Sequence, residues 1–443
     1  MFYIVESDSQ IEGLKGFSDK GAYIEVITSN DNYHPILTDV VAIYLRPLEA
    51  NEGFIIPIHH DEGLNIEIQR VSPILKSFNI LYTFNRKDSL YHFNLTNTLD
   101  VSLLFSMTKF ERLELPRTNQ TINWFYNRLV DFKEVNSLIP LTKLFQKCEE
   151  NYKYLEPYFS IKLPNGFEFY NTVATNVFYL VEQSGLRITY QAFLDLFKPQ
   201  EPKFSIQDNI TYTSYNLNNV TSRPTNAFNS VNFAAIPKAP EFRKAIIPQN
   251  DVFVEFDFDG YHLRLLCDQI GYELTEESAH MQLAKLYFGK DEIAEEDYAK
   301  AKQINFHAIY GKIPPEYAFL PIFEKIQTYI DSLWQQYQEK GYVQDPISGK
   351  RFTHELKDMH PQKLMNYMMQ SLETSRNILI LKDTLKFLRT KKSKLVLYTY
   401  DAIIIDFSKQ DGQETLVELE KIMSQEGKFP TKFKYSNNLV FQK

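Results

Sequence analysis

Short runs of hydrophobic and β-branched residues alternate with polar segments through the first third of the chain. Such runs predict strands, and they fall at 22–28, 40–46, 54–58 and 80–84. An amphipathic segment over 65–78 predicts a helix before the last of these strands. Residues 1–135 are therefore predicted to form a mixed α/β domain.

The pattern then becomes helical. Apolar residues recur at helical spacing over 138–148 and again over 173–197. The segment 198–219 contains prolines and many Asn, Thr and Ser residues, which predicts a loop or linker. We accordingly expect residues 136–205 to form a helical connector.

A third part of the chain combines both patterns. A strand is predicted at 252–256, helical spacing dominates 261–388, and a hairpin-like pair of apolar runs surrounds Asp401. Residues 206–443 are therefore predicted to form the largest domain. The whole chain is predicted to be a multidomain protein of α/β and α+β type.

Composition narrows the class of protein. With 443 residues, 44% of them hydrophobic and 23% charged, the chain is typical of a globular protein. Its two cysteines, Cys148 and Cys267, fit neither a disulfide framework nor a cysteine-rich zinc site. Without a long apolar run or a signal-peptide pattern, we expect a cytoplasmic protein with no membrane partner. The net charge of −8 argues mildly against a nucleic-acid partner, although basic residues cluster over 382–394.

Two aspartates and one helix face carry the candidate chemistry. Asp257 and Asp401 each follow a β-branched or aromatic run, and carboxylates of this kind can hold the two magnesium ions of phosphoryl transfer. Lys302, Phe306 and Tyr310 between them share one helix face. An isolated aspartate after a strand is usually a cap, and an aromatic stripe is usually core. Their combination favours nucleotidyl transfer.

The order and spacing of these segments resemble the three catalytic motifs of family A DNA polymerases, the bacterial DNA polymerase I type. The similarity extends upstream through 221–226 and 236–246, and downstream through 366–370. It implies a right-hand polymerase domain with palm and fingers over 206–443. It also implies template-directed DNA synthesis from a primer and dNTPs, with two Mg²⁺ ions for which Mn²⁺ can substitute.

The resemblance assigns a role to each matching residue. Asp257 and Asp401 would bind the metal ions, and with Lys302 they would form the catalytic set. The incoming nucleotide would contact Arg243, His262, Lys302, Phe306 and Tyr310. The primer–template would contact Arg223, Asn366 and Gln370.

Several positions depart from the family pattern. Tyr298 stands where an arginine usually precedes the motif lysine, and His307 replaces a glycine. His262 stands where a glutamate closes the sugar pocket against a ribose 2′-hydroxyl. Ala402 replaces the glutamate that follows the second aspartate. Discrimination against ribonucleotides is therefore open, although an imidazole is bulky enough to block the same space.

Residues 1–135 resemble the ribonuclease H-like 3′-5′ exonuclease domain of the same family. A working site there needs four carboxylates, but the first acidic pair reads Glu25-Val26-Ile27. The next motif, 85–88, is one residue short, and the last, 126–131, is off register. We expect a degenerate domain without proofreading activity, because Ile27 cannot bind a metal ion.

The thumb, which grips the duplex in this family, is predicted to be reduced. Only about two dozen residues separate Phe197 from Arg223, too few for a long helical hairpin. We therefore expect low processivity or a partner protein that supplies the clamp. The short length, the missing proofreading and the divergent motifs favour a phage or mobile-element replication enzyme.

Two other functions remain open. A single-subunit RNA polymerase shares the paired aspartates and the Lys–Tyr helix, and His262 keeps this alternative in play. A non-catalytic protein that binds primer–template is the other, although it would be expected to have lost Asp257, Lys302 or Asp401.

Overall fold

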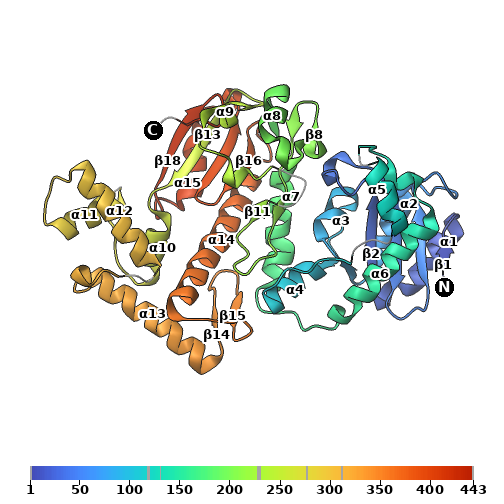
Figure 1. Ribbon diagram of the computed structural model, residues 1–443, viewed down its shortest axis with the longest axis horizontal. Coiled ribbons are helices and arrows are strands. Elements are labelled where there is room, and N and C mark those ends of the chain that lie inside the picture. Colours follow the sequence, from blue (N-terminus) through green and yellow to red (C-terminus); the bar gives the residue numbers. More distant parts are fainter. Residues whose placement is uncertain are drawn as a thin grey trace. The chain divides into compact units, whose positions relative to one another are not determined.

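The computed structural model describes residues 2–116, 120–129, 131–226, 231–275, 278–310 and 313–441, and the chain divides into two compact units (Figure 1). Unit 1 contains Met1–Gln183, Leu194–Asn218 and Asn226–Val231. Unit 2 contains Ser184–Phe193, Asn219–Thr225 and Asn232–Lys443. The predicted three-part division of the chain stays a prediction.

Unit 1 is built on a six-stranded sheet with the order β1-β4-β3-β2-β5-β6. Its strands are β1 (Phe2–Ile4), β2 (Ala22–Thr28), β3 (Val40–Pro47), β4 (Gly53–Pro57), β5 (Leu81–Thr83) and β6 (Thr98–Asp100). The β2–β3 and β3–β4 pairs are antiparallel, whereas β1–β4, β2–β5 and β5–β6 are parallel. The four hydrophobic runs of this region thus coincide with β2, β3, β4 and β5.

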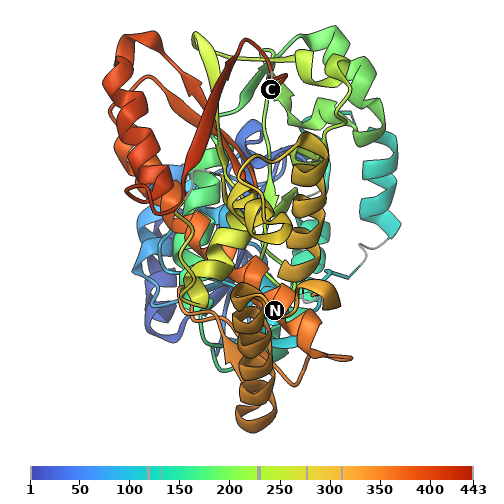
Figure 2. The same ribbon diagram turned by 90° about the vertical axis from the view of Figure 1, so that its left-hand side faces the viewer.

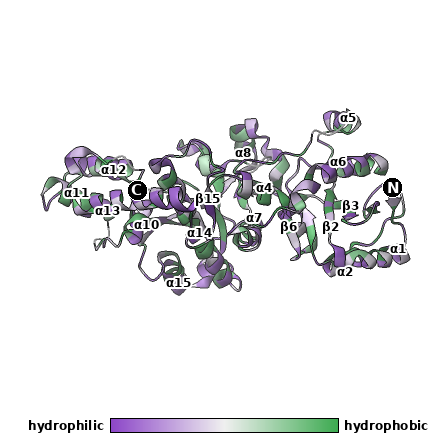
Figure 3. Ribbon diagram, turned by 90° about the horizontal axis from the view of Figure 1, so that it is seen from below, coloured by the Kyte–Doolittle hydropathy of each residue, from purple (hydrophilic) through white to green (hydrophobic). Residues whose placement is uncertain are grey.

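Helices surround this sheet. They are α1 (Asp8–Gly13), α2 (Ile68–Ser77), α3 (Arg86–Phe93), α4 (Val101–Lys109), α5 (Gln120–Leu129), α6 (Leu141–Phe159) and α7 (Thr175–Glu182). The strands β2 and β3 form the hydrophobic centre of the unit, green in Figure 3, and Ile24, Ile43 and Tyr44 are fully buried there. Burial of these apolar side chains is the main driving force for this sheet.

Unit 2 is built on a four-stranded antiparallel sheet with the order β16-β17-β13-β18. Its strands are β13 (Val252–Phe258), β16 (Lys394–Thr399), β17 (Ala402–Phe407) and β18 (Thr431–Ser436). The helix α15 (Gln413–Ser424) packs against β13 and β18 (Figure 2). The long helix α14 (Pro361–Leu388) contacts α15 and β16.

The remaining elements of unit 2 are mostly helical. They are α9 (Pro240–Lys244), α10 (Tyr261–Gln269), α11 (Ala279–Phe288), α12 (Glu295–Ile309) and α13 (Pro321–Lys340). The helices α11 and α12 pack side by side, gold in Figure 1, and α10 contacts both α12 and α14. This packing brings α12 and α14 toward the end of β13.

Two helical predictions are wrong in part, because strands interrupt both spans. The span 173–197 contains α7, then β7 (Leu186–Ile188), then α8 (Tyr190–Phe197), and β7 pairs with β12 (Ile246–Ile247). The span 261–388 contains a hairpin of β14 (Tyr342–Gln344) and β15 (Arg351–Thr353). Gly341, with φ of 78°, caps α13, and Gly185, also at positive φ, follows shortly after the end of α7. The short run at β7 becomes a strand through a partner distant in sequence, whereas β14 and β15 pair with each other as a local hairpin.

The predicted linker, 198–219, contains short elements only. These are two 3₁₀ turns and the two-residue strands β8 (Ile206–Gln207), β9 (Ile210–Thr211) and β10 (Tyr215–Asn216).

A search of the described residues finds no helix with the length and apolar character needed to cross a membrane.

Candidate active site

The two predicted catalytic aspartates lie at the same end of the unit 2 sheet. Asp257 is near the end of β13, and its backbone register pairs it with Ala402, the first residue of β17. Asp401 lies in the β16–β17 turn, immediately before Ala402, and its carbonyl accepts the Phe258 amide at 3.2 Å. Antiparallel pairing of β13 with β17 therefore brings together two residues 144 positions apart in the chain.

The turn that carries Asp401 has an unusual backbone. Tyr400 has φ of 69°, a left-handed conformation that is uncommon for a bulky side chain. The buried Asn377 of α14 donates a hydrogen bond of 2.8 Å to the Tyr400 carbonyl. Asn377 also accepts from the Tyr261 hydroxyl at 2.6 Å and donates to the Tyr398 hydroxyl at 3.0 Å. One side chain thus anchors the segments that follow Asp257 and precede Asp401.

Gly260 makes the turn from β13 into α10. Its φ is 56°, and a Cβ there would lie 3.2 Å from the Ala279 side chain. The adjacent Asp259 is a structural residue, since its Oδ2 pairs with Arg264 at 3.2 Å and accepts the Ala279 amide at 2.9 Å. Of the two aspartates at this strand end, only Asp257 is left for a ligand.

The predicted face of α12 lies beside the aspartates. The helix ends at Ile309, and Tyr310 caps it. Lys302 is exposed and Phe306 is 60% exposed, so neither belongs to the core. The Phe306 and Tyr310 rings lie edge to face with centroids 4.9 Å apart. A cation and two aromatic rings are thus presented along one line.

Tyr298, which stands where the family pattern has an arginine, lies next to Lys302. The Lys302 ammonium lies 4.8 Å from the centroid of the Tyr298 ring, one helical turn earlier. The same helix is fixed to α11 through the buried Asn305, whose amide contacts His280 Nδ1 at 2.9 Å. Burial and the Lys302 charge lower the pKa of His280, which favours its neutral form.

A cavity of about 390 Å³ opens between these elements. Its lining consists of Arg223, Gly260, Tyr261, His262, Leu263, His280, Lys302, Phe306, Ile309, Tyr310, Glu373 and Asp401. Five residues predicted from sequence, at positions 223, 262, 302, 306 and 310, therefore line one cavity together with Asp401.

Glu373 is the member of this cavity that the sequence analysis missed. It lies on α14, 1% exposed, with Oε2 at 3.1 Å from Arg223 Nε and 3.1 Å from His262 Nε2. The Arg223 guanidinium also stacks over the Tyr400 ring, 3.9 Å from its centroid. A signal was available, because Glu373 follows Gln370 by three residues and so shares its helix face.

Negative charge accumulates around the aspartates. Burial and the neighbouring Asp401 raise the pKa of Asp257. The protein packed around its carboxyl and the negative charge of Glu373 raise the pKa of Asp401, although the residue keeps a solvent-exposed side. Neighbouring carboxylates whose negative charge raises a pKa in this way form a site that a cation would stabilise.

The predicted primer–template residues Asn366 and Gln370 lie next to the segment that carries Arg223. Gln370 donates to Asn366 at 2.9 Å and accepts from the Thr221 hydroxyl at 3.3 Å. The fully buried Ser222, with φ of 55°, contacts the buried Lys350 ammonium at 2.5 Å. The β14–β15 hairpin therefore fixes the backbone beside Arg223.

Arg243 is not brought into the cavity. It lies on α9, where its guanidinium contacts the carbonyls of Pro237 and Leu439, both at 3.4 Å. Arg243 is absent from the cavity lining, as is Asp257, and its predicted contact with the nucleotide stays a prediction.

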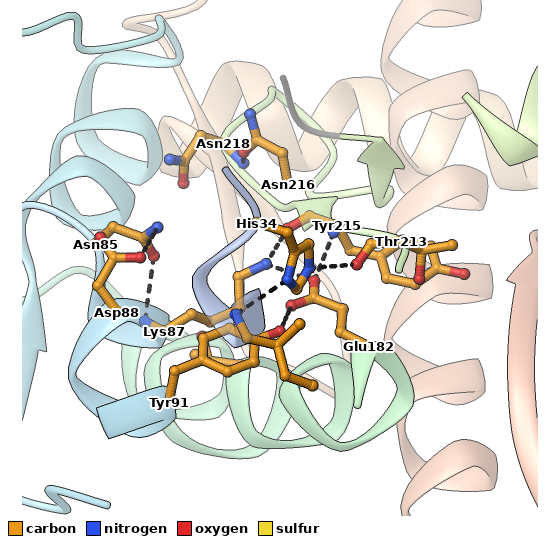
Figure 4. Close-up of polar contacts among 12 residues, drawn as sticks. His34, Asn85, Lys87, Asp88, Tyr91, Glu182, Thr213, Tyr215, Asn216 and Asn218 are labelled. Atoms are coloured by element: carbon orange, nitrogen blue, oxygen red, sulfur yellow. Dashed lines mark hydrogen bonds and ion pairs between the residues drawn. The ribbon is translucent and has the colours of Figure 1, made fainter. Parts of the chain in front are cut away.

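Unit 1 has a cavity of its own, of about 380 Å³, lined in part by Lys87. Lys87 pairs with the fully buried Glu182 at 2.6 Å (Figure 4). Glu182 also accepts from the Tyr91 hydroxyl and the Tyr215 amide, both at 2.6 Å. His34 donates from Nε2 to the Thr213 carbonyl at 2.8 Å, and burial lowers its pKa to about 4.

The carboxylates of this cavity already have partners. Asp31 pairs with Lys147 at 2.6 Å, and Asp100 caps α4 through the Leu103 amide at 2.8 Å. Burial raises the pKa of Asp88 to about 7. Ile27 is buried in β2. In the described part of the chain, no three His, Cys, Asp or Glu side chains converge as a ready-made metal site.

Comparison with known proteins extends these observations. No family model and no curated protein matches the sequence. Among solved structures, the POL domain of Pol1 from M. smegmatis, in complex with DNA primer-template and dNTP, is similar with a TM-score of 0.68. The similarity covers 99% of each chain at 12% sequence identity. The chain has the fold of a DNA polymerase domain. This confirms the predicted mixed α/β fold and its likeness to a polymerase domain.

Proposed function

We propose that the protein is a template-directed DNA polymerase that extends a primer with dNTPs. The observation that carries this proposal is the cavity where Asp401, beside Asp257, faces the exposed Lys302 and Phe306. A fold shared with a polymerase domain that was solved with primer-template and dNTP supports it.

The aspartates fit magnesium. Magnesium is commonly held by one or two carboxylates together with substrate phosphates, and rarely by a cage made of protein ligands alone. Two carboxylates with raised pKa values at one end of the sheet match this requirement. Bound divalent ions would stabilise the charge that develops on the attacking and leaving oxygens.

The other residues would bind and orient the substrates. Lys302 would hold the triphosphate as a point charge, and Phe306 would offer a flat face to the base. Tyr310 and His262 would bound the sugar. Arg223, held between Glu373 and Tyr400, would contact the primer–template together with Asn366 and Gln370. Positioning of this kind supplies much of the rate enhancement in phosphoryl transfer.

Unit 1 would be a structural remnant of a 3′-5′ exonuclease. The β4-β3-β2-β5-β6 order, with β2 antiparallel to β3 and parallel to β5, supports a ribonuclease H-like fold. Ile27 stands at one ligand position, and the half-buried Lys87 and Lys147 pair with Glu182 and Asp31, so carboxylates of the described part of unit 1 are engaged with the protein itself. The wild-type protein should therefore leave single-stranded DNA intact when incubated with Mg²⁺ alone.

Primer extension tests the proposal. The protein is incubated with a primer–template, Mg²⁺ and either dNTPs or rNTPs, beside an Asp401→Asn variant. Extension by dNTPs in the wild type and not in the variant is the expected result. Extension by rNTPs alone would favour the RNA polymerase, and binding without extension by either would favour an accessory protein.

A further inference from the structure

The cavity of unit 2 contains a carboxylate that none of the proposed steps uses. Glu373 is 1% exposed, and a buried carboxylate is costly unless charged or polar groups compensate it. Its Oε2 lies 3.1 Å from both Arg223 Nε and His262 Nε2. Of these two partners, only Arg223 carries a permanent positive charge. The contact of Glu373 with His262 therefore calls for a separate explanation.

The imidazole of His262 is held from both sides. Its Nε2 faces the Glu373 carboxylate, and its Nδ1 lies 3.4 Å from the Tyr310 hydroxyl. A carboxylate at Nε2 favours the tautomer with the proton there, which leaves Nδ1 to accept from Tyr310. The two rings stand at 83° with centroids 6.4 Å apart. The contacts select one tautomer and one ring orientation.

The proposed chemistry places the sugar beside these rings. The α-phosphate must lie at Asp257 and Asp401, and the distal phosphates extend toward Lys302. The sugar is bonded to the α-phosphate on the side away from the distal phosphates. Tyr310 lies about 12 Å along α12 from Lys302, at a rise of about 1.5 Å per residue. His262 and Tyr310 therefore bound the sugar end of the cavity.

We propose that Glu373 is a positioning residue for sugar selection: it holds the imidazole of His262 against Tyr310, so that the wall admits 2′-deoxyribose and excludes the ribose 2′-hydroxyl. This inference rests on the proposed polymerase function. The selecting carboxylate then comes from α14, three residues after Gln370, and acts through the histidine.

Rigidity is what makes such a wall selective. A ribose 2′-hydroxyl would have to displace the imidazole, and this would break its contacts with Glu373 and Tyr310 together. Loss of paired buried polar groups is a strong basis for discrimination, whereas a mobile ring would turn aside at little cost. Without Glu373 the imidazole keeps its volume but loses its fixed orientation.

Single-nucleotide insertion tests this inference. The ratio of kcat/KM for a dNTP to that for the matching rNTP is measured for the wild type, E373Q, E373A, H262A and E373A/H262A. We expect the ratio to fall by about tenfold or more in E373A and H262A, and no further in the double variant. E373Q should show a smaller loss, because its amide keeps the shape but not the charge.

Arg223, the other partner of Glu373, provides the matched control. R223A should lower the rates with both sugars and leave their ratio unchanged. A wild-type ratio in E373A or E373Q would overturn the inference, as would independent, multiplicative effects in the double variant. If thermal unfolding shows that E373A does not fold, the dNTP to rNTP ratios of E373Q and Tyr310→Phe test the inference instead. Failure of the wild type to extend with dNTPs would instead refute the proposed function.

Discussion

Asn377 offers the sharpest test of how α14 supports the site. Its side chain makes three hydrogen bonds, to the Tyr261 hydroxyl, the Tyr398 hydroxyl and the Tyr400 carbonyl. It is fully buried, so water cannot replace these bonds. At about 1 kcal/mol for each bond, Asn377→Ala should lower the free energy of unfolding of unit 2 by about 3 kcal/mol.

Urea unfolding followed by tryptophan fluorescence measures this change. The chain has two tryptophans, Trp124 in unit 1 and Trp334 in unit 2, so a Trp124→Phe background reports on unit 2 alone. Asn366→Ala is the matched control on the same helix, because Asn366 is only half-buried and its side chain bonds to Gln370 of the same helix. It should cost less than about 1 kcal/mol.

Asn377→Ala should also slow primer extension. Loss of the bond to the Tyr400 carbonyl lets the turn that carries Asp401 relax, and a displacement of about 1 Å can cost on the order of 100-fold in rate. In the unfolding experiment, a decrease of less than about 0.5 kcal/mol in the free energy of unfolding for Asn377→Ala would refute the anchoring role of Asn377. Equal decreases for Asn377→Ala and Asn366→Ala would refute it as well.

Three further predictions follow from buried charges. Asp257→Asn should stabilise the metal-free protein at neutral pH and abolish extension, because burial and Asp401 raise the pKa of Asp257. With the pKa raised, the folded state holds its proton over a window above the ordinary carboxyl range, and wild-type stability falls as pH rises through that window. Burial lowers the pKa of Lys350 from 10.5 to about 7, so the unfolded chain binds the extra proton between these values. Stability should therefore rise with pH across that interval, and Lys350→Met should remove the rise. Lys87→Met should cost about 3–5 kcal/mol, because it leaves Glu182 buried and unpaired, and adding Glu182→Gln should recover part of the loss.

Chemical unfolding as a function of pH measures all three, and each has its own contradicting result. A less stable metal-free Asp257→Asn protein would show that the aspartate is already compensated. An unchanged pH dependence in Lys350→Met would mean that the buried ammonium keeps its charge throughout. If the Lys87→Met and Lys87→Met/Glu182→Gln proteins unfold alike, the charge on Glu182 is not the source of the cost.

Local sequence patterns were enough to predict much of the fold. The strand β2 begins and ends at the predicted residues, and the helix predicted to carry Lys302 and Phe306 forms as α12. These features depend on periodicity and residue type, which are properties of neighbouring residues. The strands β7, β14 and β15 could not be predicted in this way, since each is a three-residue run that becomes a strand only through its partner.

The sequence by itself determined which residues are candidates for the chemistry: two aspartates, a lysine and the aromatic residues between them. The tertiary structure decided which of these meet and what completes them. It pairs β13 with β17 to join Asp257 and Asp401, and it leaves Arg243 outside the cavity. It also places Glu373 against Arg223 and His262. The physical reason is that a buried carboxylate depends on the charged and polar groups around it, and residues 150 and 111 positions away supply them here.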